Sequence, residues 1–390
     1  MAMTCFVKRI LQSALCLTVF LYSTTVDAQI SRIENLLNKI ESYNNFSYQS
    51  IIKRKDMSAD TTVAHNKELF LKAPHDKLYG YLYSIETDYK TEKFHKIDLY
   101  TGDGLNILSP QDSTFSREKR PSSEYSRSLM GGLKFLRDRF NKRPFKIAML
   151  KDTIINAVTN SHLIANVYDT LDNNDHLYSN RHYYINKQTG LPSLITIKGR
   201  YKYNGLVNDY YDETQYFDYK LNRADITNAS FVIPKGFKPP ANKITPDLLA
   251  VGTTAPDWTL YDANGKKLSL SELKGKVVML DFYFIGCSGC MASIKPLNVI
   301  YEKYQNKGLI IASLTERDSR KAVLDFERRY KIKYTSYINA DQVVKSYYVT
   351  GFPTFYFIDK EGKVGNVFVG YDDDFAGKVT SIINDLLSKK

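Results

Sequence analysis

Residues 277–290 read Val-Val-Met-Leu-Asp-Phe-Tyr-Phe-Ile-Gly-Cys-Ser-Gly-Cys. The first eight residues predict a buried strand, and the two cysteines stand where that strand passes into a helix. A cysteine at a helix start has its thiolate stabilised by unpaired N–H groups and by the positive end of the helix dipole. We therefore predict that Cys287 is the attacking nucleophile. Cys290, one turn inside the helix, is then the thiol that resolves the mixed disulfide formed by Cys287.

Two other uses of this cysteine pair are disfavoured. Zinc needs about four ligands, and the sequence from residue 251 onward offers no third cysteine and no histidine. A purely structural disulfide across two residues constrains the unfolded chain very little. The pair therefore indicates redox chemistry, and we expect neither a metal nor a cofactor.

Around this motif the sequence alternates between strand and helix patterns. The expected strands are Val277–Phe284, Leu309–Ser313, Thr354–Ile358 and Val364–Val369, and the expected helices are Cys287–Tyr304, Arg320–Tyr330 and Asp374–Leu387. Such alternation is typical of an α/β domain with helices packed on a mixed sheet.

The first half of the chain has a different pattern. Ile30, Ile33, Leu36, Leu37 and Ile40 recur at helical spacing, so a helix is expected to end near Tyr43. Aromatic and β-branched residues then alternate with a period of two, as in 46–52, 79–85, 194–203 and 216–221, and one helical pattern, Ser123 to Phe140, interrupts them. We predict an α+β domain: an antiparallel sheet with a few helices on one side.

The first 28 residues predict export. Lys8 and Arg9 precede an apolar run, and the segment ends in Val26-Asp27-Ala28, which is typical of a signal peptide cleaved after Ala28. A transmembrane anchor is disfavoured because the apolar run is shorter than the roughly 20 residues that a span needs. A lipid anchor on Cys16 is the other alternative. Cleavage would leave Cys287 and Cys290 as the only cysteines, in a bacterial periplasm or cell envelope.

Length and composition bound the domain organisation. The 390 residues are enough for two domains, and a proline-containing stretch from Pro234 to Pro246 reads as a linker. We therefore expect a signal peptide (1–28), a β-rich domain (29–233), a linker (234–250) and an α/β domain (251–390). The formal net charge is +12, but bases and acids are interspersed, which disfavours nucleic acid as a partner.

The flanks of the cysteine motif resemble a known family. Gly252-Thr253-Thr254-Ala255-Pro256-Asp257-Trp258, the run from Leu268 to Val278, the CxxC, Gly351-Phe352-Pro353-Thr354 and Phe357 to Gly362 occur in the order of the TlpA-like thioredoxins. That group shares its redoxin superfamily with alkyl-hydroperoxide reductases and thiol-specific antioxidants. The resemblance covers residues 251–390. It implies a thioredoxin fold, a cis Pro353 facing the disulfide, and a substrate segment that pairs with the backbone of Phe352 beside Thr354.

Three residues depart from the family pattern. Gly286 stands where a tryptophan usually precedes the first cysteine, which should open the substrate cleft beside Cys287. Ser293 replaces a glutamate that relatives often carry. Asp281, six residues before Cys287, instead matches the buried aspartate of thioredoxin proper. A buried carboxyl has a raised pKa and can accept the proton of Cys290, although an aspartate with a purely structural role remains the alternative.

Residues 29–245 carry a weaker resemblance. The phrases Tyr184-Ile185-Asn186 to Pro192 and Phe231 to Phe237 look like the bacterial lipoprotein-carrier fold. The resemblance implies a sheet that can hold a hydrophobic ligand. The alternative is a targeting or interaction domain whose aromatic residues form its core.

These observations favour an exported thiol-disulfide oxidoreductase that exchanges disulfides with protein thiols, most simply as a reductase supplied by an upstream electron donor. One alternative is an envelope lipid- or protein-binding protein whose CxxC is structural or senses redox state. A peroxiredoxin is the second alternative. It is disfavoured because Leu280 and Phe284 occupy the positions where the peroxidatic motif has proline and threonine or serine.

Overall fold

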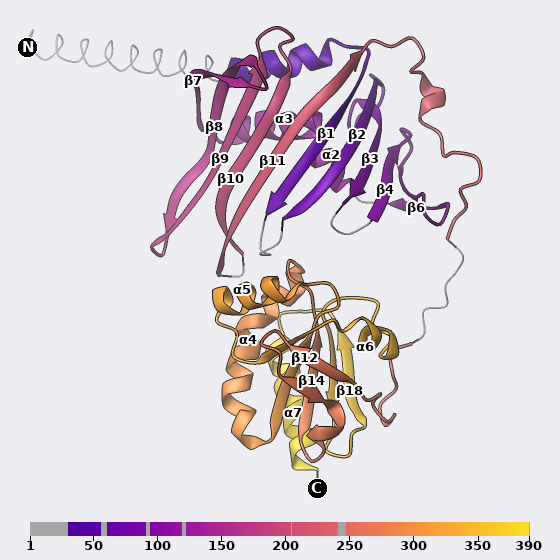
Figure 1. The fold of residues 1–390 in the computed structure, drawn as a ribbon, viewed down its shortest axis with the longest axis vertical. Helices are drawn as coiled ribbons and strands as arrows, with labels where there is room; N and C mark the ends of the chain where they lie inside the picture. Colours follow the sequence, from indigo (N-terminus) through magenta and orange to yellow (C-terminus); the bar gives the residue numbers. More distant parts are fainter. Residues whose placement is uncertain are drawn as a thin grey trace, which may run out of the picture. The chain divides into compact units, whose positions relative to one another are not determined.

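The computed structural model describes residues 30–55, 61–90, 94–118, 122–203, 205–240 and 247–389 (Figure 1). These residues form two compact units, one built mainly from the chain before residue 241 and the other mainly from the chain after residue 246. The predicted signal peptide, 1–28, lies outside the described residues. Within the described ranges, no helix combines the length and apolarity that a membrane crossing requires.

The amino-terminal unit is built on one sheet of eleven strands in the order β6-β5-β4-β3-β2-β1-β11-β10-β9-β8-β7. The predicted antiparallel sheet is therefore confirmed, and its strands are longer and more numerous than the sequence suggested. The strands are β1 (Asn45–Lys55), β2 (Thr62–Lys72), β3 (Tyr81–Tyr89), β4 (Phe94–Tyr100), β5 (Leu105–Ser109), β6 (Thr114–Glu118), β7 (Lys146–Ile155), β8 (Val158–Asp172), β9 (Asp175–Asn186), β10 (Pro192–Tyr203) and β11 (Leu206–Leu221).

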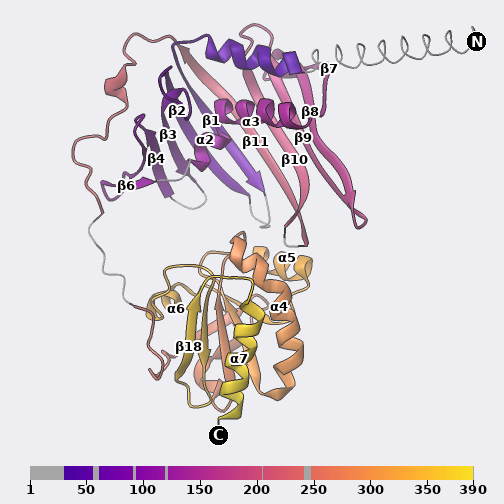
Figure 2. The same cartoon turned by 180° about the vertical axis from the view of Figure 1, so that it is seen from behind.

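Helices cover one face of this sheet (Figure 2). They are a helix over residues 30–41, α2 (Ser123–Arg127) and α3 (Leu129–Lys142). The single helix predicted from Ser123 to Phe140 is wrong, because Ser128 has an extended backbone and divides it. The Ser128 hydroxyl accepts a hydrogen bond from the Gly131 N–H (3.1 Å), so the same residue that ends α2 caps α3. With so few helical residues, this unit is mainly β.

Aromatic side chains fill the space between the helices and the sheet. The rings of Phe46 and Phe70 stack with centroids 4.8 Å apart, and Tyr83 lies 4.9 Å from Tyr125 of α2. The period-two pattern of the sequence thus places one side of each strand in the core.

A smaller cluster lies on the other face of the sheet. Phe231 packs there with Leu99 and Leu108. Lys238 pairs with β6, since its N–H donates to Ser113 O (3.0 Å) and its carbonyl accepts from the Phe115 N–H (3.0 Å). The first residues of the predicted linker are therefore held against the amino-terminal sheet.

The carboxy-terminal unit has a mixed sheet of seven strands in the order β13-β12-β16-β15-β14-β17-β18. The strands are β12 (Thr259–Asp262), β13 (Lys267–Ser269), β14 (Val277–Phe282), β15 (Leu309–Leu314), β16 (Thr335–Ile338), β17 (Thr354–Ile358) and β18 (Val364–Val369). The helices are α4 (Ser288–Tyr304), α5 (Arg320–Tyr330), α6 (Asp341–Ser346) and α7 (Phe375–Ser388). The α/β architecture is as predicted, whereas β12, β13, β16 and α6 were not expected from the sequence.

The central strand β14 is buried along its whole length. It pairs in parallel with β15 and antiparallel with β17. Val278, Leu280 and Phe282 belong to the core that contains α6, whereas Val277 and Met279 belong to the core that contains α4 and α7. Because side chains alternate along a strand, Asp281 shares the face of Val277 and Met279.

The fold predicts that a fragment of residues 247–390 folds alone. Leu248 and Leu249 pack against the core of this unit, and the Leu249 N–H donates to the Tyr356 hydroxyl (3.0 Å). The fragment should unfold cooperatively in a thermal scan followed by circular dichroism. A second fragment that begins at Ala250 should be less stable by roughly 1–3 kcal/mol, because it lacks two partly buried leucines. Insolubility of the longer fragment, or equal stability of the two, would contradict this reading.

Candidate active site

The redox pair lies at the junction of β14 and α4. Cys287 is the residue that caps α4, and its Sγ accepts a hydrogen bond from the Cys290 N–H (3.1 Å). The two cysteines form a disulfide with their Cα atoms 5.2 Å apart. Both side chains are almost fully buried, at 6% and 3% exposure. The sulfur of Cys287 thus occupies the position that helix N–H groups stabilise for an anion.

Gly286 precedes the pair with a left-handed backbone, φ +97°. A Cβ added to Gly286 would meet no atom within 4 Å. There is therefore room for a side chain at this position. The backbone conformation, however, is unfavourable for any residue with a Cβ. Gly286 itself is exposed while Cys287 is buried, so an opened cleft beside Cys287 stays a prediction.

The loop before β17 lies directly against the cysteine turn. The Phe352–Pro353 peptide bond is cis, and a Cβ added to Gly289 would stand 2.9 Å from Cδ of Pro353. The Thr354 hydroxyl donates to Gly351 O (2.7 Å), and the Gly370 N–H donates to Pro353 O (2.8 Å). Since the side chain of Thr354 is buried within its own loop, it holds the loop in shape from the inside.

The loop between β15 and α5 supplies residues that sequence reasoning missed. Asp318 Oδ2 accepts hydrogen bonds from the Ile285 N–H (3.0 Å) and from the Thr315 hydroxyl (2.6 Å), which fastens the backbone just before the redox pair. The Arg317 guanidinium lies over the rings of Phe284 (4.5 Å) and Phe352 (5.5 Å). A usable signal existed, because loops after neighbouring parallel strands meet at the same edge of a sheet.

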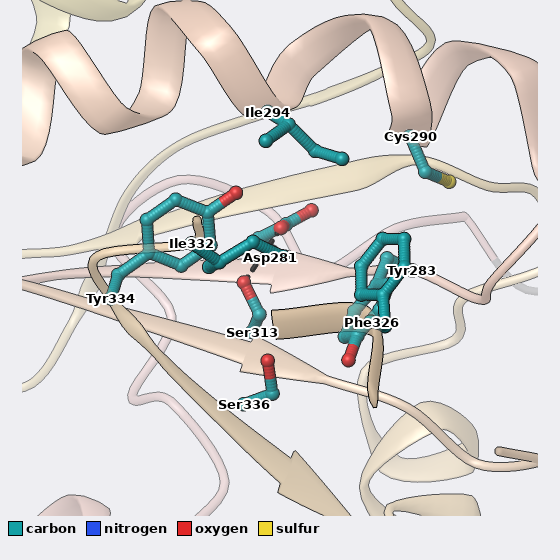
Figure 3. A pocket seen from close by; sticks show the side chains of 9 residues that line it. All are labelled: Asp281, Tyr283, Cys290, Ile294, Ser313, Phe326, Ile332, Tyr334 and Ser336. Carbon is teal, nitrogen blue, oxygen red and sulfur yellow. Dashed lines mark hydrogen bonds between the residues drawn. The ribbon is translucent and has the colours of Figure 1, made fainter. Parts of the chain in front are cut away.

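Asp281 is buried beneath the redox pair, at 4% exposure (Figure 3). The Ser313 hydroxyl donates to its Oδ2 (2.7 Å), while its Oδ1 has no hydrogen-bond partner among the residues that the structure describes. Burial raises the pKa of Asp281 to about 7, and the hydrogen bond from Ser313 opposes this rise. The carboxyl can therefore be either ionised or protonated near neutral pH.

A small cavity connects this carboxyl with the second cysteine. Asp281 and Cys290 both line it, together with Tyr283 and Ser336, and its volume is about 10 Å³. This is the size of a single water molecule, and the unpaired polar atoms of Asp281, Tyr283 and Ser336 could satisfy one. Asp281 and Cys290 therefore face the same small, partly polar space.

Ser293 holds no comparable position. Its hydroxyl donates to Cys290 O (2.9 Å) inside α4, and the side chain is buried. The glutamate that relatives carry at this position has no acidic substitute in this turn of the helix. Asp281 is therefore the carboxyl that faces the redox pair from within the sheet.

The chain matches known proteins over this half. Residues 251–367 match the AhpC/TSA family. The chain is 34% identical over 123 residues to a thiol-disulfide oxidoreductase ResA of Bacillus cereus, covering 31% of this chain and 71% of that protein. The corresponding protein of Bacillus subtilis (strain 168) is 33% identical, over 31% of this chain and 69% of its own length.

Solved structures of similar proteins cover the same part of the chain. The thioredoxin domain of a thiol-disulfide oxidoreductase from Bacteroides vulgatus is 29% identical, with a TM-score of 0.33, over 35% of this chain and 99% of that one. A thiol:disulfide interchange protein from Bacteroides sp. is also 29% identical, with a TM-score of 0.32, over 35% of this chain and 91% of that one. With two ResA proteins matched over about 70% of their lengths, the chain belongs, through its carboxy-terminal thioredoxin-fold domain, to the thiol-disulfide oxidoreductases of the AhpC/TSA family.

Proposed function

We propose that the protein is an exported reductase of protein disulfides. The observation that carries this proposal is the placement of Cys287 at the start of α4 with Cys290 above a buried carboxyl. A reductase needs a base for Cys290, because the second thiol must lose its proton before it can release the substrate. The amino-terminal signal pattern supports export. An upstream electron donor returns the pair to the dithiol form after each turnover.

The reaction proceeds through two exchanges. The Cys287 thiolate attacks one sulfur of a substrate disulfide, the substrate S–S bond breaks, and the first substrate thiolate leaves. Cys290 then gives its proton to Asp281 and attacks Sγ of Cys287. The mixed disulfide breaks, the second substrate thiolate leaves and is protonated by water, and the Cys287–Cys290 disulfide remains. The substrate gains two electrons and the cysteine pair loses two.

Substrate binds, in this proposal, on the surface beside the cis proline. The backbone of Phe352 pairs with an extended segment of the substrate, and Pro353 keeps that segment against the disulfide. Gly286 leaves room for bulky substrate residues next to Cys287. Thr354 contributes by holding the loop, since its hydroxyl is bonded to Gly351 O.

A second candidate function concerns the amino-terminal unit, for which we propose a hydrophobic ligand. A cavity of about 160 Å³ lies between α3 and the sheet. Ile195, Ile197 and Leu133 contribute apolar side chains to its wall. Arg181 and the ion pair of Arg54 with Asp212 (2.7 Å) supply polar groups. Pockets of this composition bury the apolar part of a ligand and orient it by a few polar groups.

The proposed roles of the cysteines predict opposite effects of two substitutions. Cys290→Ala should keep the first attack but trap mixed disulfides, because the resolving thiol is absent, whereas Cys287→Ala should trap none. We expect the wild-type mature chain to reduce insulin in the presence of dithiothreitol, and both variants should lose this activity. Non-reducing gels and mass spectrometry identify the trapped species. Trapping by both variants, or by neither, would reverse or remove these roles.

The proposed role of Asp281 predicts a selective kinetic defect. Asp281→Asn should slow release of the mixed disulfide by roughly 10- to 1000-fold, because the proton acceptor is lost, and leave the first attack nearly unchanged. Stopped-flow fluorescence separates the two steps. An unchanged release rate would return Asp281 to a structural role.

The same variant should change the dependence of stability on pH. Folding raises the pKa of Asp281 from its ordinary 3.8 to about 7, so the folded wild type binds the proton more tightly and loses stability as pH rises from about 4 to about 7. Asp281→Asn lacks this loss and should be equally stable or more stable at pH 8, by roughly 1–3 kcal/mol. Urea unfolding at pH 5 and pH 8 measures the difference.

The ligand proposal predicts that filling the cavity blocks binding. Gly132 lines the cavity, and a Cβ added to it would meet nothing within 4 Å, so a larger side chain can enter. Gly132→Leu should weaken binding of a fluorescent dodecanoic acid by about tenfold or more, in line with about 1.4 kcal/mol per factor of ten. Gly132→Ala is the matched control and should bind normally. No binding by the wild type, or equal binding by all three proteins, would remove this function.

A further inference from the structure

Three polar residues form a row across the sheet beneath the redox pair. Asp281 of β14 is the register partner of Ser313 of β15, and Ser313 is the register partner of Ser336 of β16. Register partners in neighbouring strands have side chains on the same face. All three residues are buried, at 4% exposure or less, in a core that is otherwise largely apolar and aromatic. Figure 3 shows Ser313 between Asp281 and Ser336.

The hydroxyl groups in this row have unused hydrogen-bonding capacity. The Ser313 hydroxyl donates to Asp281, which leaves its oxygen able to accept. The Ser336 hydroxyl has no partner of good geometry within the described part of the chain. This hydroxyl lines the same small cavity as Asp281, so it is available for further hydrogen bonds.

The row ends at a second carboxyl. Glu327 of α5 accepts a hydrogen bond at Oε1 from the Ser336 N–H (3.1 Å). Burial raises the pKa of Glu327, the hydroxyl and N–H of Ser336 oppose the rise, and Asp262 adds to it. Unlike Asp281, Glu327 is only partly buried and reaches solvent. The row therefore leads from the interior of the sheet to the surface at α5.

We propose that Ser313, Ser336 and Glu327 form a proton path between Asp281 and solvent. This inference rests on the proposed role of Asp281 as the proton acceptor of Cys290. Serine hydroxyls both donate and accept, so each can take a proton from one neighbour and pass its own to the next. Glu327 is the group that exchanges the proton with water.

The path accounts for the proton that Cys290 loses and regains in each turnover. During substrate reduction the proton moves from Cys290 to Asp281, then through Ser313 and Ser336 to Glu327, and finally to water. Each hydroxyl loses one proton and gains one, so neither serine changes. When the electron donor reduces the disulfide, the same path returns a proton to Cys290 in the reverse direction.

The other titratable groups around Asp281 do not provide a route for its proton to solvent. Tyr283 directly follows β14 and Tyr334 directly precedes β16. Burial raises the pKa of both phenols well above 10, so they keep their protons at neutral pH. Cys290 of α4 is the proton source itself. Asp318 acts on Tyr283 by its charge, but its carboxylate is bonded to the Ile285 N–H and to Thr315.

The test is the rate of mixed-disulfide release in the full mature chain carrying Glu327→Gln or Ser336→Ala. At pH 6.5, where Asp281 starts largely protonated and its proton must leave first, each variant should slow release by about 3- to 30-fold, below the effect of a direct acid-base group. The difference in release rate from the wild type should vanish near pH 8.5, where Asp281 is already ionised. Added imidazole at about 50 mM should restore the rate by carrying the proton, as a small general base can.

Two controls separate this path from a structural role. Asp325→Asn removes an acid from the same helix that is paired with Lys321 and Arg328 at the surface, and it should keep the wild-type rate. Ser336→Thr retains a hydroxyl and should keep most of the wild-type rate. Wild-type rates in both test variants at pH 6.5, or a defect that is equal at all pH values and insensitive to imidazole, would overturn the path. If the path fails in this way but Asp281→Asn still slows release of the mixed disulfide, the proposed role of Asp281 as proton acceptor stands.

Discussion

The pairing of β14 with β15 on one side and β17 on the other is the constraint on which the catalytic domain depends. It makes β14 the middle of the sheet and buries every residue of the strand. The end of β14 carries the cysteines into α4, the end of β15 supplies the loop with Asp318, and the start of β17 brings Pro353 against Gly289. Three loops distant in the sequence thus converge because three strands share a register.

The sequence predicted many local elements correctly, but it did not predict which strands pair or in what register. It predicted β17, β18 and α5 to the residue, because each is a strong periodic or apolar run between turn residues. It missed β16, a strand of only four residues, Thr-Ser-Tyr-Ile, in which three of the side chains carry a hydroxyl. It also missed the break at Ser128, where a residue with no apolar signal ends one helix and caps the next.

The same limit applies to the site. Asp281 could be singled out as the acidic residue of an apolar strand, and Cys287 and Cys290 by their spacing. Ser313 and Ser336 could not, because each is an ordinary serine until the parallel register places Ser313 beside Asp281 and Ser336 beside Ser313. The proposed role of Glu327 likewise depends on how α5 packs over β16, which no periodicity specifies.

Burial and a raised pKa alone do not make a carboxyl of this protein a candidate for proton transfer. Glu68 in the amino-terminal sheet is as deeply buried as Asp281, and burial likewise raises its pKa to about 7. Its two oxygens, however, accept hydrogen bonds from Tyr48 and Ser50, and Tyr48 in turn accepts from the Leu129 N–H at the start of α3. Through Tyr48, the Glu68 carboxyl therefore links α3 to the sheet. Asp281 differs because one of its oxygens stays unpaired and shares a cavity with a cysteine.

The left-handed backbone of Gly286 limits how this domain could diverge further. In the relatives that it resembles, a tryptophan usually occupies this position, yet placing one here by a single substitution would cost about 1–2 kcal/mol in backbone strain. The lack of a side chain directly before Cys287 is therefore fixed by the course of the main chain and not by the choice of one residue. A descendant that acquired a bulky residue before Cys287 would have to remodel the turn first.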